Sequence, residues 1–328
     1  MNKTTNINDS LLLDDNLKIL DTLSRFIALY FTTIISIIGI SINLSILITL
    51  RRNVFRHKFY ETISITTFFD LAYCVFGAFN LYMFCSNCED RKFNTYNFLF
   101  YKWYIIILPC RAVYICLTLA HINLITNRYF VILNKSNIFT NISKKILISS
   151  FLVISWIIWI FPFYFVIELY SIDNTYSWRI SEFGSNIFVK IYNFSLFICD
   201  TIVASVILLI FTGLSVKHTV NIYAKKADLL PNHKKFLKKK EKMITNISLM
   251  VTIICILARF LDMLSGMLNR FEAYDLIEGT LLNQSLINFA RTSTLAFNMT
   301  ISSLNGLFYF KFDQKFRKEI FELFRIKS

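Results

Sequence analysis

Apolar residues in this chain gather in long runs, and the polar and charged residues lie mostly between those runs. A helix needs about 20 mainly apolar residues to cross the hydrocarbon core of a membrane. Because lipid offers no partner to backbone polar groups, each such run must cross as a complete helix. The pattern predicts an all-α membrane protein, a seven-transmembrane helix bundle. The runs are 26–50, 63–84, 104–126, 146–170, 187–216, 244–268 and 286–310.

The composition agrees with this fold class. Hydrophobic residues make up 55% of the 328 residues, whereas a soluble domain has about 45 to 50% even when glycine is counted. The chain has 7 glycines and 3 prolines, which is few for a loop-rich or all-β protein of this length. The cysteines show no zinc or haem spacing, so we expect neither a metal nor a cofactor.

Positive charges lie in alternate connections between the runs. By the positive-inside rule these connections face the cytoplasm, which places the amino terminus on the opposite side of the membrane. We expect the protein to lie in the plasma membrane with this terminus outside the cell. We expect 1–25 to be extracellular, 26–310 to form the membrane domain and 311–328 to lie in the cytoplasm. This topology accounts for most of the net charge of +14, so we expect contacts with membrane lipid and none with nucleic acid. The internal positive residues include Arg51, Arg52, Arg56, Lys58, Lys135, Lys144, Lys145 and nine lysines between 217 and 242.

The amino-terminal segment has no uninterrupted apolar core and no cleavage site of a secretory signal. We therefore expect the first run itself to direct insertion. Asn2 and Asn8 each begin an Asn-X-Ser/Thr acceptor sequon. An external terminus makes both of them predicted glycosylation sites.

A set of polar residues interrupts the apolar runs. Polar groups inside a membrane are costly, so each is a candidate functional position. The structural alternative is a satisfied polar cluster that only packs helices together. The set comprises Asn43 in the first run, Asp70 in the second, Asn127, Arg128 and Tyr129 at the end of the third, and Ser302, Asn305 and Tyr309 in the seventh.

In order and spacing, these residues resemble the fingerprint of rhodopsin-like G-protein-coupled receptors across nearly the whole chain. Asn127-Arg128-Tyr129 is similar to the family's Asp-Arg-Tyr, with the acid replaced by its amide. The segment that begins at Asn305 is similar to Asn-Pro-x-x-Tyr, with glycine in place of proline. Further matches are Asn43, Asp70 and Trp156 in the first, second and fourth runs, and the amphipathic segment 312–324, which resembles the family's eighth helix.

The resemblance implies a receptor for an extracellular ligand that activates a heterotrimeric G protein. Asn127, Arg128 and Tyr129 are then the activation switch, together with Asn305 and Tyr309. Ligand binding at the outer ends of the third, fifth, sixth and seventh helices would favour an outward swing of the sixth helix. The carboxy-terminal helix of a G-protein α subunit would enter the cleft that opens beside Arg128. From their residue types we expect Asn43, Asp70 and Ser302 to face the bundle interior with Asn305 and to form an interior polar network.

The sequence departs from the family in three places. The segment 172–194 holds no cysteine, so the usual staple between the third helix and the second external loop cannot form. Cys85 and Cys88 are left free to pair with each other or with Cys110, or to remain thiols. Asn127 offers Arg128 a neutral hydrogen bond in place of a salt bridge, which predicts raised basal signalling. The sixth run lacks proline and tryptophan.

Charged residues in the outer parts of the runs bear on the ligand. Arg259 and Asp262 lie three apart on one helical face. With Arg111 and Arg291 they predict a net positive external pocket; the alternative is an internal ion pair with arginines that reach the membrane interface. Such a pocket favours a peptide with acidic or carboxylate features. The overall texture resembles invertebrate neuropeptide receptors of the FMRFamide type and their chemosensory relatives, so a small-molecule chemosensory ligand is the alternative.

Other classes of protein fit less well. An amine receptor would hold a carboxylate where Arg111 stands, and an opsin would hold a lysine within 286–310, which has none. A transporter or channel would show self-similar halves, and we find none. An enzyme is not expected, because neither His-Glu-x-x-His nor Gly-x-Ser-x-Gly occurs.

Overall fold

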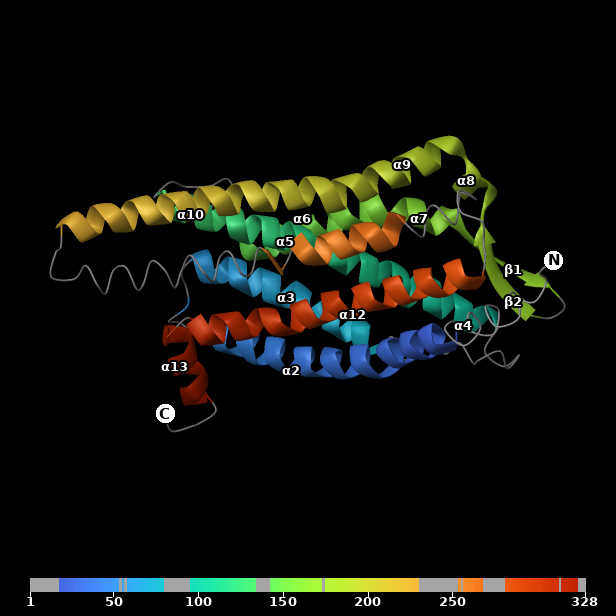
Figure 1. The fold of residues 1–328 in the computed structure, drawn as a ribbon, viewed down its shortest axis with the longest axis horizontal. Helices are drawn as coiled ribbons and strands as arrows, with labels where there is room; N and C mark the ends of the chain where they lie inside the picture. Colours follow the sequence, from blue (N-terminus) through green and yellow to red (C-terminus); the bar gives the residue numbers. More distant parts are fainter. Residues whose placement is uncertain are drawn as a thin grey trace, which may run out of the picture.

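The computed structural model describes residues 18–52, 55, 58–79, 95–133, 142–172, 175–229, 253–254, 256–267, 281–312 and 314–323. Long helices run side by side along the longest axis of the molecule (Figure 1). A two-stranded hairpin stands at one end of this bundle, and the short helix α13 lies across the opposite end. The long helices therefore run between these two ends.

The first three helices all begin earlier than predicted, and the second also ends earlier. The first helix runs from Lys18 and contains α2 (Thr32–Leu50), and the second is α3 (Lys58–Ala78). The third contains α4 (Tyr96–Phe100), a π-helical segment (Tyr101–Ile107) and α5 (Leu108–Ile132). In α3, Glu61 in the first turn stabilises the earlier start of the helix.

The fourth and fifth helices are joined by the hairpin. The fourth comprises α6 (Lys144–Ile154), a π-helical segment (Ser155–Ile160) and α7 (Phe161–Val166). The hairpin pairs β1 (Ile167–Ile172) with β2 (Thr175–Ile180) in antiparallel register, and α8 (Glu182–Ser185) follows it. The fifth comprises α9 (Ile187–Ile198), a π-helical segment (Cys199–Val203) and α10 (Ala204–Leu229).

The predicted end of the fourth helix at residue 170 was wrong. The helix ends at Val166, and the backbone adopts an extended conformation from Ile167. Strand β1 therefore contains the residues predicted to end the helix. β-branched and aromatic residues in both segments suit paired strands as well as they suit a lipid-facing helix. Apolar content alone therefore misplaces this boundary.

The remaining helices complete the bundle. The segment 256–267 is helical within the sixth run, and α12 (Leu281–Phe312) forms the seventh helix. Helix α13 (Gln314–Leu323) buries Phe316 against Phe55, with ring centroids 5.8 Å apart. Arg52 Nη1 lies 2.7 Å from Glu319 Oε2 and fastens α13 to the end of the first helix. The predicted amphipathic eighth helix is confirmed.

Helices α2, α3 and α12 pack unusually closely. A Cβ added at Gly39 of α2 would lie 2.6 Å from Sγ of Cys74 in α3 and would overlap the Ser303 hydroxyl of α12. A Cβ at Gly77 would lie 2.6 Å from Sδ of Met299. Small residues let helix backbones approach each other in a membrane, where packing rather than water drives association. This close approach brings polar side chains of the three helices together.

Within the described residues, four helices are long and apolar enough to cross a membrane. They are Lys18–Leu50, Tyr96–Phe130, Lys144–Val166 and Ile187–Ile222.

Candidate functional site

A buried carboxylate lies at the centre of the bundle. Asp70 of α3 is 1% exposed, and both of its oxygens accept hydrogen bonds from Nδ2 of Asn305 in α12, at 3.4 and 3.2 Å. Nε2 of His121 in α5 lies 3.3 Å from the same Asn305 nitrogen. Burying a carboxylate is costly unless it is hydrogen-bonded. These contacts therefore join the second, third and seventh helices around one group.

The first helix reaches the same cluster. Nδ2 of Asn43 donates to the backbone carbonyl of Ser302 at 3.0 Å. The Ser302 side chain also hydrogen-bonds Asp70. The Ser303 hydroxyl donates to the carbonyl of Ile35 at 2.9 Å. We call Asn43, Asp70, His121, Ser302 and Asn305 the inner cluster.

The structure thus brings together Asn43, Asp70, Ser302 and Asn305, the polar residues expected to face the bundle interior. His121 is a member that the sequence analysis missed. A histidine within an apolar run was the available signal, because intramembrane titratable groups are rarely accidental.

The Asn-Arg-Tyr motif lies at the end of α5. Asn127 is buried, and its Nδ2 donates to the Thr62 hydroxyl of α3 at 3.4 Å. The Tyr129 ring lies 5.6 Å from the ring of Phe211 and 5.7 Å from that of His218, both in α10. Arg128 stands half-buried between these two contacts. The motif therefore sits where the second, third and fifth helices meet.

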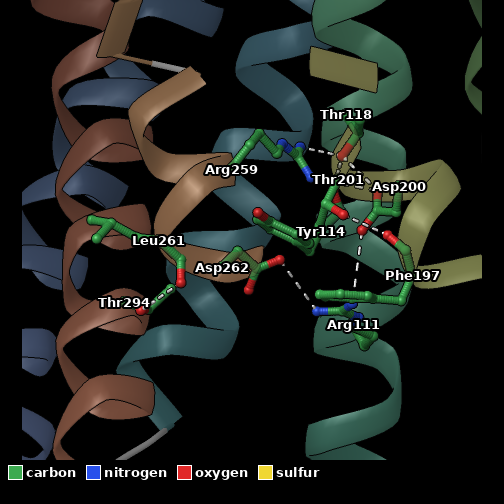
Figure 2. Close-up of polar contacts among 10 residues, drawn as sticks. All are labelled: Arg111, Tyr114, Thr118, Phe197, Asp200, Thr201, Arg259, Leu261, Asp262 and Thr294. Atoms are coloured by element: carbon green, nitrogen blue, oxygen red, sulfur yellow. Dashed lines mark hydrogen bonds and ion pairs between the residues drawn. The ribbon is translucent and has the colours of Figure 1, made fainter. Parts of the chain in front are cut away.

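A second polar cluster lies nearer the hairpin end and carries full charges. In Figure 2, Arg259 of segment 256–267 points toward Asp200 of the fifth helix and Thr118 of α5. Its Nη1 lies 3.4 Å from Asp200 Oδ1, and its Nη2 donates to the Thr118 hydroxyl. The Thr118 hydroxyl in turn lies 3.3 Å from Asp200 Oδ1. Both charged side chains are almost fully buried, at 6% and 2% exposure.

Arg111 links this pair to a second carboxylate. Its Nη2 lies 3.7 Å from Asp200 Oδ2, and its Nη1 lies 3.9 Å from Asp262 Oδ2 (Figure 2). The guanidinium groups of Arg259 and Arg111 lie 4.4 and 5.5 Å from the centre of the Tyr114 ring. Arginine binds favourably to an aromatic face in this range. We call Arg111, Tyr114, Thr118, Asp200, Arg259 and Asp262 the outer cluster.

Two further cations lie beside the outer cluster. Arg291 of α12 is exposed and interacts electrostatically with Arg111 and with Lys102, which precedes α5. Among the side chains that the structure describes here, four cations face two carboxylates. The sequence left open a net positive pocket or an internal ion pair. Features of both are present, because internal ion pairs form and positive charge remains in excess.

The sequence analysis missed Asp200 and Lys102. Asp200 is a lone acid in the fifth apolar run, and the rule that singled out Asp70 applies to it equally. Lys102 lies two residues before the predicted start of the third run, outside the apolar stretch that drew attention to polar residues.

A small cavity separates the two clusters. Its volume is about 30 Å³, and its lining includes Arg259 and Tyr114 of the outer cluster and His121 and Ser302 of the inner cluster. The volume exceeds the roughly 15 Å³ that one water molecule requires. Polar side chains from both clusters thus border one hydratable space.

Several predicted positions lie elsewhere or beyond the described part of the chain. Cys110 is a free thiol, whereas Cys85 and Cys88 lie outside the described residues, as do Asn2 and Asn8. The backbone of Tyr309 belongs to α12, but its side chain is not among those described. Trp156 is 38% exposed on the fourth helix.

No protein-family model and no curated protein matches the chain. The fold is similar to that in the crystal structure of squid rhodopsin, with a TM-score of 0.64 and 17% sequence identity. The similarity covers 93% of this chain and 86% of that chain. At this identity the likeness shows the fold. It confirms the predicted all-α fold, a seven-transmembrane helix bundle with a short amphipathic eighth helix.

Proposed function

We propose that this chain is a divergent rhodopsin-like G-protein-coupled receptor of the plasma membrane, with its amino terminus outside. It binds an extracellular ligand and activates a heterotrimeric G protein. The observation that carries the proposal is the contact of Asn305 with Asp70, joined to Asn43 through Ser302. Residues matched to the family on sequence alone meet in one cluster of a rhodopsin-like fold.

The proposed mechanism is a shift between two populations of the bundle. Arg128 is always charged and forms forked hydrogen bonds, so it can hold one set of partners at rest and another when active. Asn127 is engaged by Thr62 and offers Arg128 no negative charge. Outward movement of the sixth helix opens a cleft beside Arg128 for the G protein.

The ligand that we propose is a peptide with a carboxylate or other acidic group. The exposed Arg291, the partly exposed Arg111 and nearby Lys102 support it, because they leave positive charge in excess at the outer cluster. A small-molecule chemosensory ligand with the same anionic group is the second candidate. Screening a peptide library and a library of small organic acids against one calcium and cyclic-nucleotide reporter distinguishes the two.

The test of the receptor function is nucleotide exchange on membranes that contain the protein and a mixture of G proteins. We expect exchange above that of empty membranes, and loss of most of it in Arg128→Ala. Lys145→Ala is the control, because it removes an exposed cation at the start of α6, outside the Asn-Arg-Tyr motif. Conductance or solute uptake without nucleotide exchange would instead identify a channel or transporter.

A further inference from the structure

The two arginines of the outer cluster differ in access and in how firmly they are held. The Arg259 side chain is 6% exposed and is bound by Asp200 and by the Thr118 hydroxyl. The Arg111 side chain is 37% exposed, and its two acidic neighbours lie at 3.7 and 3.9 Å. A ligand entering from the hairpin end therefore meets Arg111 and finds Arg259 already enclosed.

The contact between Arg111 and Asp262 is a weak link between two helices. Oδ2 of Asp262 is buried and accepts no hydrogen bond from any described residue, although it lies 3.9 Å from Nη1 of Arg111. Attraction between partly exposed charges without a hydrogen bond stabilises little. Figure 2 shows this contact as the one dashed line between Asp262 and the third helix.

The surroundings of Arg111 favour a second anion. Arg291 and Lys102 both add positive charge near it, and neither forms an ion pair with a described residue. A carboxylate on a ligand can form two parallel hydrogen bonds with a guanidinium group, and such pairs are among the strongest in proteins. Asp262 at 3.9 Å forms no such bond and is the weaker competitor.

We propose that an anionic group of the ligand displaces Asp262 from Arg111 and thereby removes one of the links between the sixth helix and the third, while Arg259 stays bound to Asp200 and Thr118 and contacts no ligand. This inference rests on the proposed receptor function. The freed carboxylate of Asp262 and the bound carboxylate of the ligand repel each other. Repulsion favours a bundle in which the sixth helix lies further away, so ligand affinity and helix position are coupled.

The first test removes the link without a ligand. Asp262→Asn keeps the size of the side chain and loses its charge, so we expect basal nucleotide exchange to rise about two- to fivefold. Asp262→Glu keeps the negative charge and should leave basal exchange closer to that of the wild type. Glu168→Gln is the control, because it removes the exposed Glu168–Arg179 pair of the hairpin at the same end.

The second test supplies the anion. The probes are 3-phenylpropionate and its uncharged amide, added to wild-type membranes at equal concentrations. We expect the carboxylate to raise exchange more than the amide, and we expect this difference to vanish in Asp262→Asn. Equal effects of the two probes on the wild type, or an unchanged difference in Asp262→Asn, would overturn the displacement.

A third measurement separates this inference from the proposed function. Hydrogen exchange of 256–267 in the purified protein needs no G protein, and release of Asp262 should accelerate it in Asp262→Asn but not in Glu168→Gln. Faster hydrogen exchange without nucleotide exchange in any variant would refute the receptor function and keep the link. Normal nucleotide exchange with unchanged hydrogen exchange would refute the link and keep the receptor.

Discussion

The inner and outer clusters solve the same physical problem in different ways. In the inner cluster a single carboxylate, Asp70, accepts hydrogen bonds from the neutral amide of Asn305 at 3.2 and 3.4 Å, between helices that pack closely at Gly39 and Gly77. In the outer cluster two arginines neutralise two carboxylates at 3.4 to 3.9 Å, and Arg111 stays partly open. Short neutral contacts fix a structure, whereas longer contacts between full charges leave room for an incoming charge to compete. We infer that the inner cluster holds the bundle together, whereas the outer cluster responds to an incoming charged ligand.

The largest effect is expected where a buried charge loses its partner. Arg259→Ala leaves Asp200 almost fully buried with only the Thr118 hydroxyl and the partly exposed Arg111 beside it, and losing one partner of a buried pair costs about 3 to 5 kcal/mol. Thermal unfolding in detergent measures this loss. The double variant Arg259→Met with Asp200→Leu should recover much of it, because apolar residues of similar size replace both charges. If Arg259→Ala proved as stable as the wild type, the role that we assign to the Arg259–Asp200 pair would be wrong.

The next largest loss of stability is expected where helices pack closely around the inner cluster. Gly39→Ala would force Cys74 or Ser303 to move, and overpacking of this kind costs about 1 to 3 kcal/mol. Gly213→Ala is a matched control in α10, where an added Cβ meets no atom within 4 Å. There we expect a gain of about 0.5 to 1 kcal/mol from helix propensity. Thermal unfolding of the two variants side by side measures the contrast, and equal effects would show that α2 does not pack as closely as the structure indicates.

Removing the inner hydrogen bonds should destabilise the protein by a comparable amount. Asn305→Ala takes away the amide that donates to both oxygens of Asp70, and an unsatisfied buried acceptor costs about 1 to 3 kcal/mol. Both stability and nucleotide exchange should fall, since the residue is placed in the switch as well as in the cluster. Asn305→Asp is the informative companion, because it sets a second carboxylate beside Asp70 and should be worse than alanine at neutral pH. An Asn305→Asp variant that exceeds the alanine variant in stability would mean that Asp70 is not the charged centre of this cluster.

The smallest effect concerns the Asn-Arg-Tyr motif. Asn127→Asp adds a negative charge beside Arg128 and should lower basal nucleotide exchange by about two- to fivefold, because a charged restraint replaces a neutral one. Basal exchange in membranes without added ligand measures it. If the wild type is no more active than Asn127→Asp, the proposed loss of restraint is wrong.

The sequence predicted the fold class and all members of the inner cluster except His121, because both can be recognised from the apolar runs and the polar residues within them. Apolar runs long enough to cross a bilayer are rarely anything else, and polar residues such as Asp70 stand out within them. The helix ends were less predictable, as the hairpin that begins at Ile167 demonstrates. An apolar run cannot by itself distinguish a helix from the strand that follows it.

Contacts between charges were the least predictable feature. In a membrane the lipid-facing and the core-facing sides of a helix are both apolar, so hydrophobic periodicity does not reveal which side turns inward. The spacing of Arg259 and Asp262 indicated that they share a helical face, yet their ion-pair partners include Asp200 and Arg111 on two other helices. Those pairings depend on helix rotations that only the folded structure provides.

The most direct test of the account is the orientation of the chain in intact cells. One epitope is placed before residue 26 and another after residue 323, and antibody binding is compared before and after the plasma membrane is permeabilised. The account predicts that the first epitope is reached on intact cells and the second only after permeabilisation. The reverse result would put Arg128 on the outer surface, where no G protein can reach it, and would contradict the receptor interpretation.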